Sequence, residues 1–172
     1  MRNQLVFIVG TSRSDGNTWH LLNYINKDLG AKLIDLTELN ISYFDYQQRN
    51  IDDDYIATIE EILKYDTIAF VSPMYWYTVS AQMKTFIDRF SDLLGSRKDL
   101  GRKLRGKKTF LVATGNTEER VNAGMEEPIK LTSEYLGMNY QGAFYTRVKN
   151  DLQIEPHILE QASNFVRSIL QG

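Results

Sequence analysis

Cysteine is absent from this chain of 172 residues, and its absence excludes several kinds of chemistry at once. Without thiols there are no disulfides, no thiolate nucleophiles and no cysteine-ligated zinc or iron–sulfur centres. A strong charge of either sign is also missing, because 20 Lys and Arg residues face 22 Asp and Glu residues. A net charge of −2 gives no electrostatic reason to expect nucleic acid or a membrane surface as a partner.

Long apolar runs are missing too. A membrane-spanning helix needs about 20 consecutive apolar residues, and no stretch approaches that length. The first ten residues, MRNQLVFIVG, contain too short an apolar run for a secretory signal and no small-residue cleavage site. We therefore expect a cytoplasmic protein without a membrane span. The length suits one domain, so residues 1–172 are predicted to form a single one.

Two glycine-rich nucleotide motifs are not found either. The pattern GxxxxGK[ST], which cradles a triphosphate, does not occur, and neither does GxGxxG, which lets a dinucleotide pyrophosphate approach the backbone. Asp35 ends the second predicted strand, where a dinucleotide-binding protein would hold a ribose. Without the glycine pattern we interpret Asp35 as a loop cap.

What the chain does have is a regular alternation of short apolar runs with segments of helical periodicity. We predict strands at Leu5–Val9, Ala31–Leu36, Thr67–Ser72, Thr109–Thr114 and Tyr140–Thr146. Helices are predicted over Thr18–Leu29, from Asp52–Asp54 onward, over Ser80–Leu94, over Glu118–Leu136 and from Pro156 onward. This alternation predicts an α/β fold, a five-stranded parallel sheet with helices on both faces, and the common order for such a sheet is 2-1-3-4-5.

That strand order brings three unusual loops to one edge of the sheet. They follow the first, third and fourth strands, and their sequences are GTSRSDGNT, SPMYWYTVS and ATGNTEER. Because the carboxyl ends of neighbouring parallel strands open side by side, we expect these loops to form the functional site.

The first loop has the composition of an anion site at the start of a helix, where free N–H groups and the helix dipole favour negative charge. Its hydroxyls, its amide and its single guanidinium suit a terminal phosphate, and the candidate residues are Thr11, Ser12, Arg13, Ser14, Gly16, Asn17 and Thr18. The alternative is an ordinary polar turn that caps the helix, but a cap explains neither Arg13 nor four hydroxyls.

The second and third loops suit a planar ring. Three consecutive aromatic residues directly after a buried strand suggest a partly exposed platform, and the segment comprises Pro73, Met74, Tyr75, Trp76 and Tyr77. A hydrophobic lid or a subunit contact is the alternative for any one of these aromatics. Thr114, Gly115 and Asn116 then offer a permissive backbone and polar groups to the ring's hydrogen-bonding edge. A phosphate at one end and a flat polar heterocycle at the other describe FMN.

The same segments resemble the flavodoxin-like NAD(P)H-dependent FMN reductases. GTSRSDGNT is similar to that family's G-S-x-R-x-x-G-N-T loop, with Thr11 in place of Ser. SPMYWYTVSAQMKTFIDRF is similar to its P-x-Y-W-x-x-x-S-x-x-x-K-x-F-x-D-R segment, and SEYLGMNYQG is similar to its Y-L-G-M-x-x-x-G segment. The stretch ISYFDYQQRN lacks the cysteine cluster of iron–sulfur relatives, which leaves flavin as the only electron carrier.

The resemblance implies a flavodoxin-like fold and an FMN cofactor. It places Thr11, Arg13, Asn17 and Thr18 at the phosphate, residues 73–77 along the isoalloxazine, and residues 114–116 at the pyrimidine edge. It also implies NADH or NADPH as co-substrate, a quinone, free flavin or similar planar acceptor, and a homodimer or homotetramer. No side chain is then needed as a catalytic acid or base, because flavin N5 carries the hydride.

Two other functions stay open from the residues alone. A flavodoxin-type electron carrier would not oxidise NAD(P)H itself, but such carriers tend to be strongly acidic, and a net charge of −2 is small for one. A flavin-free protein of the same fold is the other alternative, because fold does not fix function.

Three further features receive structural interpretations. The run Asp52–Asp54 is read as a helix start favoured by the dipole, in preference to a metal site. His20 and His157 are read as structural because neither falls at the predicted edge. The segment Arg97–Lys108 carries seven Lys or Arg residues and is read as a solvated connection, with a contact to the extra phosphate of NADPH as the alternative.

Overall fold

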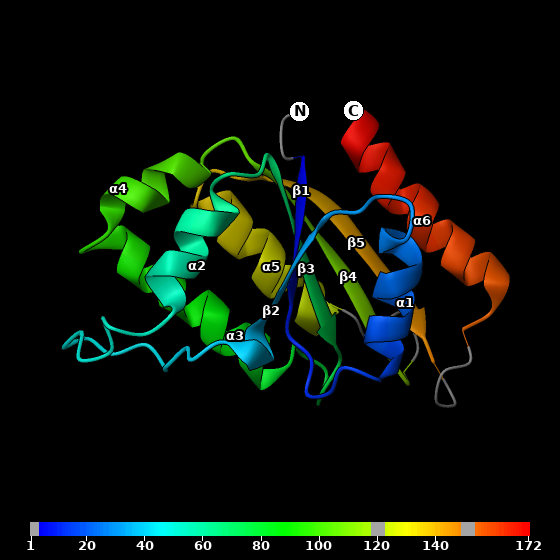
Figure 1. Ribbon diagram of the computed structural model, residues 1–172, viewed down its shortest axis with the longest axis horizontal. Helices are drawn as coiled ribbons and strands as arrows, with labels where there is room; N and C mark the ends of the chain where they lie inside the picture. The colour runs from blue at the N-terminus through cyan, green and yellow to red at the C-terminus, as the bar shows by residue number, and fades with distance from the viewer. Residues whose placement is uncertain (1–3, 118–122, 149–153) are drawn as a thin grey trace.

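The computed structural model describes residues 4–117, 123–148 and 154–172. These residues form a five-stranded parallel sheet of order β2-β1-β3-β4-β5, so the predicted order is confirmed (Figure 1). The strands are β1 (Leu5–Val9), β2 (Lys32–Asp35), β3 (Thr67–Pro73), β4 (Lys108–Gly115) and β5 (Asn139–Arg147). All five lie at the predicted positions, and the interior strands β1, β3 and β4 are buried along nearly their whole length, as expected for strands covered on both faces.

Helices cover both faces of the sheet. On one face α1 (Asn17–Asn26) and α6 (Pro156–Gln171) pack over Leu5, Phe7 and Val9 of β1. On the other face α2 (Tyr55–Ile62), α3 (Ala81–Asp88) and α5 (Ala123–Tyr135) pack over Val6 and Ile8. Successive side chains of a strand point to opposite faces, so β1 contributes to two separate cores. Within the described ranges no helix is both long and apolar enough to cross a membrane.

Two helices end earlier than their apolar periodicity predicts. Helix α1 stops at Asn26, whose side-chain amide exchanges two hydrogen bonds with the backbone of Ala31, and Gly30 then turns the chain at a φ of +56°. The helix predicted over Ser80–Leu94 is α-helical only as far as Asp88 and continues as a 3₁₀ helix, η2 (Arg89–Leu94). The predicted helix Glu118–Leu136 corresponds to α5, and its first five residues lie outside the described ranges.

The switch to a 3₁₀ helix coincides with a buried arginine. Arg89 is only 1% exposed, and its Nε donates a 2.7 Å hydrogen bond to Oδ2 of Asp92, three residues on. A 3₁₀ helix places residues i and i+3 one above the other, so it aligns this pair. The Arg89 guanidinium also pairs with Asp53, donates to the Ser42 carbonyl and lies 4.6 Å from the centre of the Tyr55 ring.

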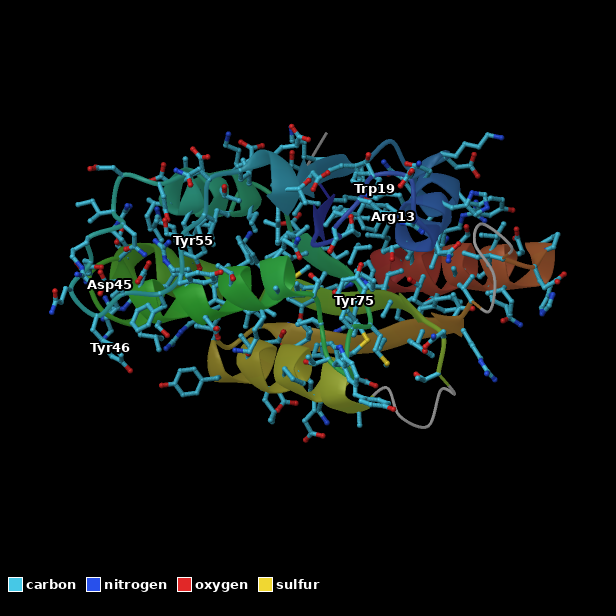
Figure 2. All side chains as sticks on the ribbon, turned by 90° about the horizontal axis from the view of Figure 1, so that it is seen from below. Arg13, Trp19, Asp45, Tyr46, Tyr55 and Tyr75 are labelled. Atoms are coloured by element: carbon cyan, nitrogen blue, oxygen red, sulfur yellow. The ribbon has the colours of Figure 1, made fainter. Side chains whose placement is uncertain are left out.

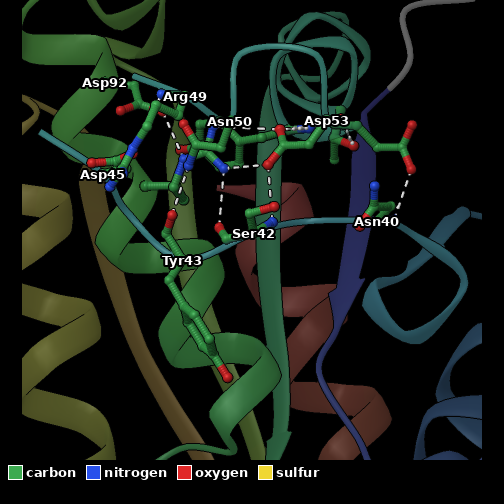
Figure 3. A network of polar contacts seen from close by, with 12 residues as sticks. Asn40, Ser42, Tyr43, Asp45, Arg49, Asn50, Asp53 and Asp92 are labelled. Atoms are coloured by element: carbon green, nitrogen blue, oxygen red, sulfur yellow. Dashed lines mark hydrogen bonds and ion pairs between the residues drawn. The ribbon is translucent and has the colours of Figure 1, made fainter. Parts of the chain in front are cut away.

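Asp53 lies in the segment 40–54 and joins that segment to Arg89 (Figure 3). Its carboxylate accepts hydrogen bonds from Arg89 and from the backbone N–H groups of Ser42 and Tyr55. Burial raises the pKa of Asp53, but these three hydrogen bonds outweigh it and hold the pKa below its usual value. The run Asp52–Asp54 was predicted to start a helix, and it has a further role. It lies before α2, and Asp53 compensates a buried charge while Asp54 accepts the Asn40 N–H.

The basic segment Arg97–Lys108 lies at the amino end of β4, and this is the edge of the sheet opposite the three loops. It contains the short helices α4 (Lys98–Gly101) and η3 (Arg102–Leu104). Lys107 donates to the carbonyls of Leu63 and Tyr65, and Lys108 donates to that of Ile169. These contacts favour its interpretation as a connection over the alternative, a contact to the extra phosphate of NADPH.

We predict that Asp53→Asn destabilises the fold. The variant leaves the buried Arg89 with Asp92 as its remaining carboxylate, and breaking a buried ion pair costs about 3 kcal/mol or more of unfolding free energy. Urea denaturation at neutral pH measures this loss. Asp88→Asn is the matched control, because it removes the exposed Lys84–Asp88 pair of α3, the helix that Arg89 follows, and should cost less than about 0.5 kcal/mol.

The pH dependence gives a second readout of the same interaction. Because the pKa of Asp53 is lowered in the folded state, its contribution is present above the unfolded value of about 3.9 and is lost as the pH falls through the folded value. Wild type should therefore lose stability below about pH 4 more steeply than Asp53→Asn. Parallel acid limbs for the two proteins would contradict the assignment.

Candidate functional site

A pocket of about 560 Å³ opens at the carboxyl ends of β1, β3 and β4, where the sequence places the site. It falls within the size range of small-molecule sites. Its described lining comprises Thr11, Ser12, Arg13, Gly16, Asn17, Thr18, Pro73, Met74, Tyr75, Thr114, Gly115, Asn116 and Val148. All three predicted loops thus contribute, and Arg13 is the one charged residue in this described lining.

The first loop is fastened to helix α3 as it leaves β1. The Ser80 hydroxyl donates a 2.6 Å hydrogen bond to the Gly10 carbonyl and accepts one from the Met83 N–H at the start of α3. The Ser72 hydroxyl in turn accepts a hydrogen bond from the Ser80 N–H. A Cβ on Gly10 would lie 2.8 Å from the Met83 Cβ, so only glycine allows this approach. The loop is therefore fixed at its base.

Thr11 lies within the turn and uses its hydroxyl locally. Its side chain is buried, and the hydroxyl donates a 2.9 Å hydrogen bond to the Arg13 carbonyl. The same oxygen accepts a 2.9 Å hydrogen bond from the indole Nε1–H of Trp19 on α1. Figure 2 shows Arg13 of the β1–α1 connection close to Trp19 of α1. The hydroxyl hydrogen of Thr11 is therefore directed into the loop.

Arg13 extends across the amino end of α1. Its side chain is 56% exposed, and its Nε lies 3.7 Å from a carboxylate oxygen of Asp15. A Cβ on Gly16, the residue before the helix, would lie 3.0 Å from that Nε. Glycine at this position therefore lets the guanidinium reach the first turn of α1, where Asn17 and Thr18 lie. Helix dipole and guanidinium together make this end of the pocket favourable for an anion.

A buried hydroxyl pair joins the first loop to the third. The Oγ1 atoms of Thr18 and Thr114 are 2.7 Å apart, and both side chains are buried. Two hydroxyls that share one hydrogen bond retain one further hydrogen between them. The pair therefore holds two walls of the pocket together.

The aromatic loop forms a tight hairpin. Tyr75 and Thr78 exchange backbone hydrogen bonds of 3.0 and 3.2 Å, with Trp76 and Tyr77 as the two central residues. Both central residues have positive φ, 49° and 67°, as a type I′ turn requires. Asparagine and glycine usually occupy such positions, so two aromatic residues store backbone strain here. Trp76 is 92% exposed and Tyr77 is 55% exposed.

The third loop packs closely beneath the hairpin. A Cβ on Gly115 would lie 2.5 Å from the Tyr145 hydroxyl and 3.0 Å from the Met74 Cβ, so this wall of the pocket is bare backbone. Tyr145 donates to the Thr117 carbonyl from below. Val148 was not among the predicted site residues, and it lines the pocket because its N–H donates to the Gly115 carbonyl. Its place directly after the strand beside β4 is the signal that points to it.

Three predicted site residues do not line the pocket. Ser14, Trp76 and Tyr77 belong to the predicted loops but lie outside this described lining. His20 and His157 are exposed and do not line it either, as their structural interpretation requires. Asp35 accepts hydrogen bonds from the N–H and hydroxyl of Thr37, so it caps the turn η1 (Leu36–Glu38) as predicted.

We predict that replacing Trp76 and Tyr77 together by Asn and Gly stabilises the fold. The replacement keeps the turn and removes the strain of two left-handed non-glycine residues, which should raise the unfolding free energy by about 1–3 kcal/mol. Urea denaturation measures the change. Tyr43→Asn is the control, because it removes an aromatic side chain that is 81% exposed from a residue without positive φ. Equal stabilities of double variant and wild type would show that the turn is unstrained.

Comparison with known proteins adds sequence relatives to this geometry. The model of a family described as NADPH-dependent FMN reductase matches residues 3–151. The putative NAD(P)H-dependent FMN-containing oxidoreductase YwqN of Bacillus subtilis (strain 168) is 26% identical over 148 residues, which cover 81% of this chain and 82% of the relative. The uncharacterized NAD(P)H oxidoreductase YcaK of Escherichia coli (strain K12) is 28% identical over 153 residues, with coverage of 79% and 76%.

Solved structures agree on the fold. The Trp repressor binding protein from Bacillus subtilis superposes with a TM-score of 0.78 at 24% identity, over 95% of this chain and 97% of that one. An FMN-dependent NADH-azoreductase from Bacillus anthracis, in complex with FMN, superposes with a TM-score of 0.70 at 10% identity, over 98% of both chains. At these identities the likeness establishes the shared fold.

Proposed function

Because the chain belongs to the NADPH-dependent FMN reductase family, a flavin-dependent oxidoreductase family, we propose that its pocket binds FMN and that it passes hydride from NADH or NADPH to a quinone, free flavin or similar planar acceptor. Family membership gives FMN as the cofactor and a nicotinamide nucleotide as the reductant. The acceptor and the residues that bind each group are our proposal.

The observation that carries this proposal is the convergence of three chemically different loops on one pocket. The β1 loop supplies a helix amino end and a guanidinium, the β3 loop supplies thioether and aromatic surface, and the β4 loop supplies bare backbone and an amide. FMN has three parts that need these three environments: a phosphate that needs positive charge and N–H donors, a flat ring that needs apolar surface, and a pyrimidine edge that needs polar backbone groups. The donors present therefore fit the group.

At the phosphate end we propose that Arg13, Asn17 and Thr18 contact the phosphate oxygens, with Ser12 at the rim and Gly16 as the point of close approach. Thr18 lies in the first turn of α1, where backbone N–H groups have no partner within the helix. A doubly charged phosphate near a helix amino end and an arginine gains charge-assisted hydrogen bonds. These residues bind and orient the cofactor.

At the ring end we propose that Pro73, Met74 and Tyr75 lie along the isoalloxazine and that Thr114, Gly115 and Asn116 face its pyrimidine edge. FMN supplies the hydride chemistry once bound, so no side chain acts as acid or base. Trp76 and Tyr77 extend beyond the lining, and we propose that they contact the acceptor; Ser14 is left as a predicted contact of the phosphate. Assembly into a homodimer or homotetramer also stays a prediction.

We predict that the purified protein, loaded with FMN, oxidises NADH or NADPH directly when a quinone is supplied. NAD(P)H and acceptor use one flavin in turn, so initial rates should follow a ping-pong pattern of parallel double-reciprocal lines. Absorbance at the reduced nicotinamide band measures the rate. An FMN-loaded protein that oxidises NAD(P)H only after a separate reductase is added would replace the enzyme with an electron carrier. Failure of the protein to bind flavin would contradict both the enzyme and the electron carrier.

We predict that Arg13→Ala weakens FMN binding about ten- to a hundredfold, the loss expected for a charge-assisted hydrogen bond. Riboflavin, which lacks the phosphate, should bind wild type and variant equally. Quenching of flavin fluorescence measures both dissociation constants. Lys27→Ala is the matched control, because it removes a positive charge at the other end of α1. Unchanged FMN affinity in Arg13→Ala would place the phosphate elsewhere.

A further inference from the structure

The loop between β1 and α1, residues 10–16, is called the anion loop below. Among the described residues, Trp19 is the one residue of α1 whose polar side-chain atom contacts the anion loop without lining the pocket. Its indole N–H donates to the Thr11 hydroxyl over 2.9 Å, and that hydroxyl donates onward to the Arg13 carbonyl over 2.9 Å. The two bonds run in one direction, from α1 through Thr11 to the peptide between Arg13 and Ser14. Aligned hydrogen bonds of this kind polarise and strengthen each other.

The arrangement also decides what Thr11 contributes. A threonine hydroxyl has a single hydrogen, and here the Arg13 carbonyl accepts it. The indole N–H restricts this hydroxyl further, because an oxygen that accepts from Trp19 must direct its own hydrogen away from the indole. Thr11 is therefore not a hydrogen-bond donor to a phosphate in this arrangement, although the sequence suggested it as one.

The Arg13 carbonyl governs the next amide. A peptide unit is planar and trans, so its C=O and the following N–H point in opposite directions. With the Arg13 carbonyl held toward the buried Thr11 side chain, the Ser14 N–H points away from that side chain. The same bond fixes the backbone from which the Arg13 side chain reaches across Gly16.

We propose that Trp19 is a positioning residue for the phosphate of FMN, acting through Thr11 on the backbone of Arg13. This inference rests on the proposed function for the identity of the ligand. It adds that recognition of the phosphate depends on an indole N–H which the ligand does not touch, and that Thr11 shapes the loop through its hydroxyl hydrogen. We call the two hydrogen bonds from Trp19 to Thr11 and from Thr11 to the Arg13 carbonyl the relay. The flavin ring lies at the other end of the pocket, so its binding does not depend on the relay.

Three variants separate the relay from general packing. Trp19→Phe keeps an aromatic ring in the half-buried position and removes the N–H. Thr11→Val keeps the shape and removes the hydroxyl, and Thr11→Ser restores the hydroxyl without the methyl group. Tyr24→Phe is the matched control on the same helix, because its hydroxyl makes one exposed contact of 3.4 Å to Glu160.

The experiment titrates each apo-protein with FMN, riboflavin and inorganic phosphate. Trp19→Phe should weaken FMN about three- to tenfold, the effect of one net hydrogen bond, and leave riboflavin within about twofold of wild type. Thr11→Val should behave in the same way, Thr11→Ser and Tyr24→Phe should match wild type, and the double variant Trp19→Phe/Thr11→Val should be no weaker than Thr11→Val alone, because one relay is lost only once.

Two results would overturn the proposal: equal losses for FMN and riboflavin in Trp19→Phe, which mark a structural role, or no loss for FMN. Failure of the proposed function has a different signature, because wild type itself would then bind no FMN. In that case the affinity for inorganic phosphate tests the relay independently of FMN. Its affinity should fall in Trp19→Phe and Thr11→Val and return in Thr11→Ser, and equal phosphate affinities in all of these proteins would remove the relay.

Discussion

The reversal of chain direction around β1 is the constraint on which the site depends. From the interior strand β1 the chain moves outward to β2, and it must then return past β1 to form β3 on the other side. The loop after β1 leads to α1 on one face of the sheet, whereas the loop after β3 leads to α3 on the other face. Two neighbouring loops that leave in opposite directions cannot fill the space between them. The pocket is this space, and β4 adds its third wall. Any sequence with this strand order opens a crevice here; the side chains of the three loops decide what enters it.

Loops that expose their backbone to a ligand give up contacts that would otherwise hold them, and short side chains replace those contacts. Ser72 and Ser80 join the end of β3 to α3, and Ser80 also holds the Gly10 carbonyl. The Thr18–Thr114 pair joins the first loop to the third. Each of these hydroxyls is buried, where an unmade hydrogen bond is costly, so each favours one arrangement of the loops over its alternatives. The pocket is therefore largely preformed, which lowers the ordering cost of binding.

How much of this was predictable follows from what a sequence pattern can encode. The strands and their order were predictable, because short apolar runs that alternate regularly with helices are compatible with few topologies. The family followed from the loop motifs, and membership confirms it. The end of α3 was not predictable, because Phe90 continues the apolar stripe while the buried Arg89 imposes a 3₁₀ helix. The role of Thr11 was not predictable either, because a sequence pattern shows that a hydroxyl is present and does not show which group accepts its hydrogen. Val148 is an ordinary apolar residue whose place beside β4 exists only in the folded sheet.

The buried Arg89 raises the question of why a charge is kept where an apolar residue of similar volume is often as stabilising. Its partners answer this in part. Asp53, Asp92 and the Ser42 carbonyl all accept from Arg89, and an apolar residue at position 89 would remove that donor from each of them, leaving Asp53 with the backbone N–H groups of Ser42 and Tyr55. The Tyr55 ring lies against the guanidinium, and its buried hydroxyl has no hydrogen-bond partner among the described residues. Because Arg89 follows directly after α3 and Ser80 caps the start of that helix, one rigid element connects the segment 40–54 to the base of the anion loop.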